Sequence, residues 1–168
     1  MGRFGFRMPT YQGMTTESDS AGVNWSYLGS DARFRTLRSM QERNLIVPLT
    51  GNFAGPRALR AIGDWVRAHG AKVTTFYVSN VEQYLFQQSD EAPRFYENVA
   101  TLPIDSTSTF VRSFAGGRFM SADTMLTLRP QSPNGRSLQL VSSIEETLRA
   151  FREGRLVSWM AVVGISHQ

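Results

Sequence analysis

One stretch of the sequence, residues 45–78, constrains the fold more than any other. Residues 45–50 form a short and almost wholly apolar run, and residues 72–78 form a second run rich in β-branched and aromatic side chains. Between them, apolar residues recur at helical spacing up to Gly70, which is a typical residue just beyond a helix end. Two such runs joined by a helix predict a parallel strand–helix–strand unit. The sequence therefore predicts an α/β fold with a mostly parallel sheet and flanking helices.

Weaker patterns predict the elements on either side of this unit. Residues 1–29 show no sustained period and are expected to form an irregular N-terminal arm, and Ser30 is expected to cap a helix that ends near residue 43. Downstream, we expect helices at 81–87 and 93–100, a strand at 109–113, a loop at 114–136, a helix capped by Ser142 or Ser143, and a last strand at 156–163. The expected organisation is an arm (1–29), an α/β unit (30–118) and a helix–strand extension of the same domain (119–168).

Composition narrows the classes of function. The chain has 168 residues, the size of one domain, and its net charge of +4 comes from arginines that are scattered along the sequence. Because no run of five or more like charges occurs, we expect no nucleic-acid partner. Cysteine is absent, which excludes disulfides and thiolate metal sites, and no apolar run approaches the roughly 18 residues of a membrane span. The N-terminus has no apolar core of a secretory signal, so we expect a cytoplasmic protein.

Polar residues gather where the two apolar runs end, and in parallel sheets ligands bind beyond the carboxyl ends of strands. The candidate residues for the rim of a substrate site are Gly51, Asn52, Ser79, Asn80, Glu82 and Tyr84. A purely structural interpretation stands beside this one. Gly51 would then relieve strain in a turn, and Asn80 would cap the next helix. His69 and His167 have no partner at metal-ligand spacing, so the sequence predicts no metal site and assigns no catalytic residue.

Several blocks of the sequence resemble one protein family. Residues 44–60, 76–86, 95–99 and 108–113 together are similar to the second half of an uncharacterised bacterial family with a Rossmann-like fold, related to class I S-adenosylmethionine-dependent methyltransferases. The resemblance implies that the first-half strands, which would carry most of the cofactor contacts, are missing from this chain. It implies that the chain binds no cofactor independently, and that S-adenosylmethionine would bind only together with a complementary polypeptide. The six rim candidates would then face the acceptor substrate.

Three hypotheses about function follow. The chain is a truncated methyltransferase-like domain that depends on a complementary polypeptide, or a non-catalytic binding or structural module that docks with a partner chain. The third hypothesis is a small hydrolase or transferase that uses Asn80, Glu82 and Tyr84. A parallel sheet of so few strands leaves an apolar edge or face uncovered, which predicts a homo-oligomer or docking with a complementary polypeptide.

Overall fold

The computed structural model describes residues 10–114 and 138–167 of the chain. The chain divides into two compact units, residues 1–49 and residues 50–168. The division falls after residue 49, so the expected arm (1–29) and the helix predicted after Ser30 lie within one unit. The predicted loop at 114–136 lies almost wholly outside the described residues.

The first unit contains two helices and no buried side chain among its described residues. Helix α1 spans Tyr11–Thr16 within the segment expected to be irregular, and helix α2 spans Asp31–Glu42. The hydroxyl of Ser30 accepts a hydrogen bond from the backbone N–H of Arg33, which confirms the predicted cap. Because none of residues 10–49 is buried, the described part of this unit has no hydrophobic core of its own.

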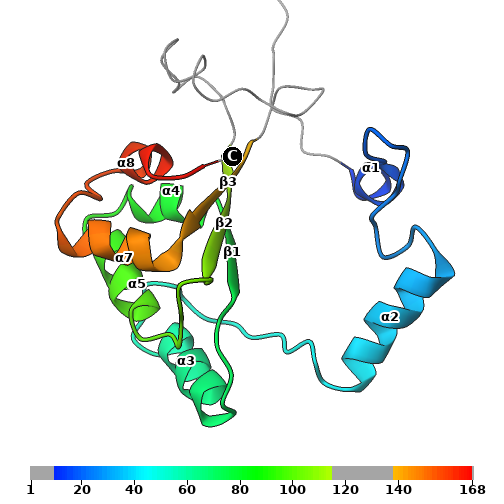
Figure 1. Cartoon of the computed structure of the whole chain (residues 1–168), viewed down its shortest axis with the longest axis horizontal. Coiled ribbons are helices and arrows are strands. Elements are labelled where there is room, and N and C mark those ends of the chain that lie inside the picture. The colour runs from blue at the N-terminus through cyan, green and yellow to red at the C-terminus, as the bar shows by residue number, and fades with distance from the viewer. Residues whose placement is uncertain (1–9, 115–137, 168) are drawn as a thin grey trace, which may run out of the picture. The chain divides into compact units, whose positions relative to one another are not determined.

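The second unit is a mixed α/β structure built around a small open sheet (Figure 1). Its described elements are α3 (Ala58–Ala68), β1 (Thr75–Ser79), α4 (Val81–Leu85), α5 (Glu91–Val99), β2 (Thr109–Phe114), β3 (Leu138–Ser143), α7 (Ile144–Arg152) and α8 (Trp159–Gly164). The sheet order is β1-β2-β3, where β1 and β2 are parallel and β2 and β3 are antiparallel. The sheet of the described residues is therefore mixed, and the prediction of a mostly parallel sheet is corrected.

The helices of the second unit cover one face of this sheet. In β2, Phe110, Arg112 and Phe114 are buried, whereas the alternate residues are only partly covered. Figure 1 shows α4, α5, α7 and α8 on the same side of the three strands. The rings of Phe95 and Phe110 lie 6.3 Å apart in the core between α5 and the sheet. Within the described residues the arrangement is one layer of helices on one layer of strands.

Most helix predictions of the second unit are confirmed. Helix α3 ends at Ala68, and Gly70 follows with a φ of 63°, a left-handed conformation that favours glycine. Ser143 caps α7, since its hydroxyl accepts a hydrogen bond from the N–H of Glu146 at 3.3 Å. None of the helices in the described ranges combines the length and apolar character needed to cross a membrane.

Two strand predictions are wrong. Residues 45–50 form no strand, and the predicted strand–helix–strand unit loses its first member. Pro48 has no N–H to give to a ladder, and the apolar side chains of this segment are exposed. Residues 156–163 were expected as a strand but contain helix α8, which starts after its cap Ser158. A short apolar run does not distinguish a buried helix from a strand, and a capping serine decides between them here.

Candidate functional site

An open groove lies where α4 ends, α5 begins and the chain leaves α7. Its volume is about 610 Å³. The residues that line it are Phe86, Gln87, Gln88, Ser89, Ala92, Pro93, Tyr96, Phe151, Leu156 and Val157. None of them carries a charge. Its size falls within the range of roughly 300–1,000 Å³ that is usual for ligand sites. We call this surface the aromatic groove.

Three rings from three elements form the aromatic part of the groove. Phe86 caps the C-terminal end of α4, Tyr96 belongs to α5, and Phe151 belongs to α7. The ring centroids of Tyr96 and Phe151 are 5.2 Å apart, and those of Phe86 and Tyr96 are 6.4 Å apart. These spacings are typical of favourable aromatic pairs. The polar residues 87–89 between α4 and α5 add amide and hydroxyl groups to this lining.

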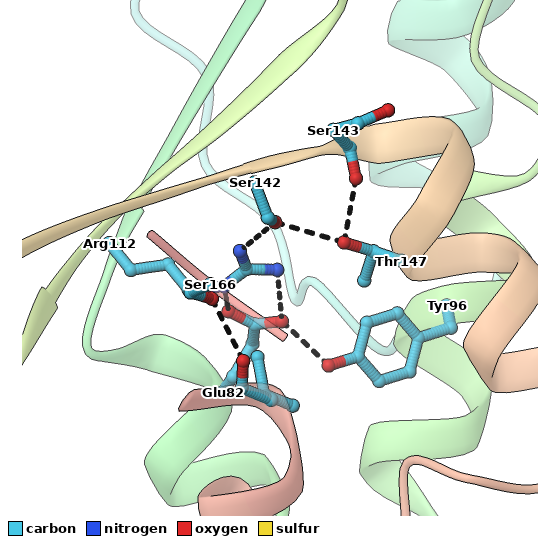
Figure 2. A network of polar contacts seen from close by, with 8 residues as sticks. Glu82, Tyr96, Arg112, Ser142, Ser143, Thr147 and Ser166 are labelled. Atoms are coloured by element: carbon cyan, nitrogen blue, oxygen red, sulfur yellow. Dashed lines mark hydrogen bonds and ion pairs between the residues drawn. The ribbon is translucent and has the colours of Figure 1, made fainter. Parts of the chain in front are cut away.

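Tyr96 connects the groove to a polar network inside the protein. Its ring lines the groove, while its hydroxyl donates a hydrogen bond of 2.6 Å to Oε1 of Glu82 (Figure 2). Burial raises the pKa of Tyr96 well above its ordinary value, and the charge and hydrogen bond of Glu82 raise it further, against a smaller opposing effect of Arg112. Tyr96 therefore stays protonated and acts as a hydrogen-bond donor.

The centre of this network is a buried ion pair between α4 and β2. Nε of Arg112 lies 2.5 Å from Oε2 of Glu82, and Nη2 lies 3.1 Å from Oε1, so the guanidinium binds the carboxylate with two parallel contacts. The Arg112 guanidinium also lies 4.4 Å from the centre of the Phe110 ring. Both charged side chains are sealed from solvent.

Hydroxyl groups extend the network to β3 and α7. Nη1 of Arg112 donates to the hydroxyl of Ser142, which lies 3.0 Å from the hydroxyl of Thr147. Thr147 in turn donates to the carbonyl of Ser143 at 2.8 Å. Figure 2 shows these groups in one connected chain of contacts. We call Glu82, Tyr96, Arg112, Ser142 and Thr147 the buried network. It ties α4, α5, β2, β3 and α7 together beneath the groove.

The structure separates the rim candidates that follow β1. Glu82 points inward to Arg112, whereas the side chain of Tyr84 is 56% exposed. Ser79 adopts a φ of 51° where β1 ends, and Asn80 precedes α4 without forming a capping hydrogen bond through its side chain. Asn80, Glu82 and Tyr84 therefore do not meet in one cavity among the described residues. Glu82 belongs to the interior and not to a rim.

The other two rim candidates belong to a turn with its own structural explanation. Oδ1 of Asn52 accepts a hydrogen bond from the N–H of Ala54, and a Cβ at Gly51 would collide with Cβ of Ala58. The buried amide of Asn98 donates to the carbonyls of Phe53 and Gly55, at 3.0 and 2.8 Å. Asn98 thus joins α5 to the turn before α3.

Sequence reasoning singled out Glu82 as a rim candidate and missed the other four members of the buried network. One signal was available, because Arg112 lies between Phe110 and Phe114 at the alternate positions that face the core. A single charge at an inward position of a strand predicts a buried partner. In the described parts of the chain, no group of three His, Cys, Asp or Glu side chains is placed to hold a metal ion.

Comparison with models of known protein families finds a match to this chain. A family model described as "Domain of unknown function (DUF7790)" matches residues 9–161, which includes both units and nearly the whole chain. No curated protein matches the sequence. The matched range contains the aromatic groove and the described members of the buried network. The chain belongs to the DUF7790 family.

Proposed function

We propose that this chain is a non-catalytic binding module whose aromatic groove receives an uncharged, apolar segment of a partner polypeptide. The observation that carries the proposal is the uncharged lining of the groove, which combines apolar side chains with the polar residues 87–89. Charged ligands would lose their hydration there without meeting an opposite charge. Aromatic and aliphatic side chains, or a proline-rich segment, would bury apolar area against the partly exposed rings of Phe86 and Phe151 and against the exposed Val157.

The burial of the charged side chains supports a non-catalytic role. Glu82 and Arg112 have the charge that acid–base catalysis needs, but both are sealed inside the protein and paired with each other. A general acid or base must reach its substrate directly or through one water molecule. The groove exposes amide and hydroxyl groups in place of such a residue. This favours the binding module over the small hydrolase or transferase.

The shape of the rim favours a polypeptide over a small molecule. Val157 lines the groove although it is 80% exposed, so one wall stands open to solvent. Small-molecule sites usually bury most of their ligand, whereas peptide grooves remain open along one side. Gln87, Gln88 and Ser89 offer donors and acceptors to the backbone of an extended segment.

A displayed library of random twelve-residue peptides provides a direct test of this site. We expect selected peptides to be neutral and rich in aromatic, aliphatic or proline residues, and to bind the full chain in fluorescence polarisation. Val157→Asp places a charge at the exposed rim and should weaken binding at least about tenfold, because apolar groups would meet a charge. Trp65→Asp, at an exposed apolar residue outside the groove, is the matched control. Equal loss in both variants, or selection of charged peptides only, would refute the proposal.

A second candidate function rests on the topology of the first two strands. β1 and β2 are parallel and connected through α4 and α5, which is the crossover used in Rossmann-like sheets. Together with the sequence resemblance, this supports a partial methyltransferase-like domain that depends on a complementary polypeptide. The described residues do not fit S-adenosylmethionine by themselves, because the Glu82 carboxylate is occupied by Arg112 and the groove has no charge for the cofactor's amino-acid end.

Calorimetric titration separates the two candidates. Under either one, the purified chain should show no heat of binding with S-adenosylmethionine or S-adenosylhomocysteine. Binding that appears only after a complementary polypeptide is added would favour the partial methyltransferase-like domain. Binding by the chain alone would contradict both, because it would require a cofactor site within this chain.

A further inference from the structure

We propose that two copies of this chain associate through the outer edges of their β1 strands, which pair antiparallel about a two-fold axis at Phe76. The two three-stranded sheets would then form one continuous sheet. This inference goes beyond the aromatic groove and uses a different surface, so either proposal can fail without the other.

The position of β1 in the sheet leaves its outer edge free in the described structure. β1 pairs with β2 on one side only. The carbonyl of Thr74 accepts a hydrogen bond from the N–H of Thr109, which directs the backbone groups of even-numbered residues toward β2. Because these groups alternate along a strand, the N–H and C=O groups of Thr75 and Tyr77 point away from the sheet. Both residues are exposed, Tyr77 by 59%.

This edge lacks two of the devices by which monomeric proteins usually protect a free strand, charged residues and proline. Edge strands are commonly guarded by charged residues, proline or a bulge. β1 contains neither charge nor proline, and its irregularity falls between Tyr77 and Ser79, after the regular part of the strand. Thr75, Phe76 and Tyr77 therefore present an uncharged, regular edge.

A second copy fits this edge because the pairing is self-complementary. With Phe76 on the axis, Thr75 lies opposite the partner's Tyr77, and each of these two pairs exchanges two backbone hydrogen bonds. The side chains of Thr75 and the partner's Tyr77 share the face of the sheet opposite the helices of the second unit, where a β-branched residue packs well on an aromatic ring. Both edges are uncharged, so no like charges meet.

The absence of cysteine allows a specific cross-linking experiment. Residues opposite each other in a hydrogen-bonded antiparallel pair have Cα atoms about 5.5 Å apart, within disulfide range. We expect a mixture of the Thr75→Cys and Tyr77→Cys full-length chains to form a covalent heterodimer under mild oxidation, and either variant alone to cross-link far less. Equal cross-linking in all three samples, or none in the mixture, would overturn the proposed register.

Sedimentation equilibrium tests the association without new covalent bonds. The wild-type chain should show a monomer–dimer equilibrium, and Tyr77→Lys should weaken it at least about tenfold, because a charge on the edge opposes pairing. Gln139→Lys adds the same charge on the same open face but on β3, and should leave the equilibrium unchanged. A wild-type chain that stays monomeric, or an equal effect of both lysines, would refute pairing through this edge.

Discussion

A buried ion pair is retained only when both charges and their remaining hydrogen-bonding groups find partners. Glu82 and Arg112 meet this condition through two contacts with each other and further bonds to Tyr96 and Ser142. Arg112→Met alone should lower the free energy of unfolding by about 3–5 kcal/mol, since it leaves the Glu82 carboxylate buried without its counter-charge. Urea denaturation followed by circular dichroism measures this change.

The double variant Glu82→Leu/Arg112→Met is the control for this loss. It removes both charges and should be markedly more stable than Arg112→Met, because no uncompensated charge remains. If the two variants unfold at the same urea concentration, the loss of stability comes from packing around Arg112 and not from the Glu82 carboxylate left without its counter-charge.

Because of Tyr96, we expect the stability of the folded protein to depend on pH in the alkaline range. Burial and Glu82 raise its pKa in the folded protein above the value of about 10 for an unfolded tyrosine. The contribution of Tyr96 to the free energy of unfolding is complete below about pH 10. It is lost as the pH rises toward the pKa of Tyr96 in the folded protein, because ionisation then favours the unfolded chain. We expect the free energy of unfolding to fall more steeply above about pH 10 in the wild type than in Tyr96→Phe.

Tyr11 is the control, because it is an exposed tyrosine whose pKa is raised mainly by its hydrogen bond with the hydroxyl of Tyr27 and not by burial in the core. Its replacement by phenylalanine should leave most of the alkaline dependence in place. Unfolding free energies measured between pH 8 and pH 11 that run parallel in wild type and Tyr96→Phe would contradict the buried role of Tyr96.

At the scale of elements, residues 45–50 show the clearest difference between the structure that the sequence pattern predicts and the structure observed. An apolar run of this kind is typical of a covered strand. In the structure the run forms no strand, and Val47 and Leu49 are 60% and 68% exposed. Val47→Thr/Leu49→Ser should therefore change the free energy of unfolding by no more than about 0.5 kcal/mol, as exposed substitutions usually do.

Val78→Ala is the contrasting change, because Val78 is buried in β1. Removing its two methyl groups should cost about 1–3 kcal/mol. Thermal unfolding of both variants gives the comparison. A loss in Val47→Thr/Leu49→Ser as large as that in Val78→Ala would mean that residues 45–50 are covered in solution.

Prediction from sequence succeeded where structure is determined locally. Ser30, Ser143 and Gly70 mark helix ends through hydrogen bonds or a φ value within one turn, so their neighbours in sequence identify them. The sequence singled out Glu82 but placed it at a substrate rim, because its buried partner Arg112 lies 30 residues further along the chain. The antiparallel pairing of β2 with β3 likewise depends on distant partners that periodicity does not reveal.

At the scale of the whole molecule, the two units differ in what holds them together. The second unit has an apolar core that includes Phe95, Phe110 and Leu148, and the buried network lies beside it. In the first unit, none of the described residues is buried, and its helices depend on capping and exposed pairs such as Arg38 with Glu42. Exposed pairs of this kind contribute about 0.3–0.5 kcal/mol each. Cooperative unfolding should therefore be a property of the second unit.

A fragment of residues 50–168 tests this directly. It keeps every buried residue described in the structure, so it should fold alone and unfold in one cooperative transition close to that of the full chain. Differential scanning calorimetry of both proteins measures the transition, and Arg112→Met in the fragment should lower its midpoint as it does in the full chain. If the fragment shows no cooperative transition, residues 1–49 supply burial that the second unit needs, and the independence of its core is refuted.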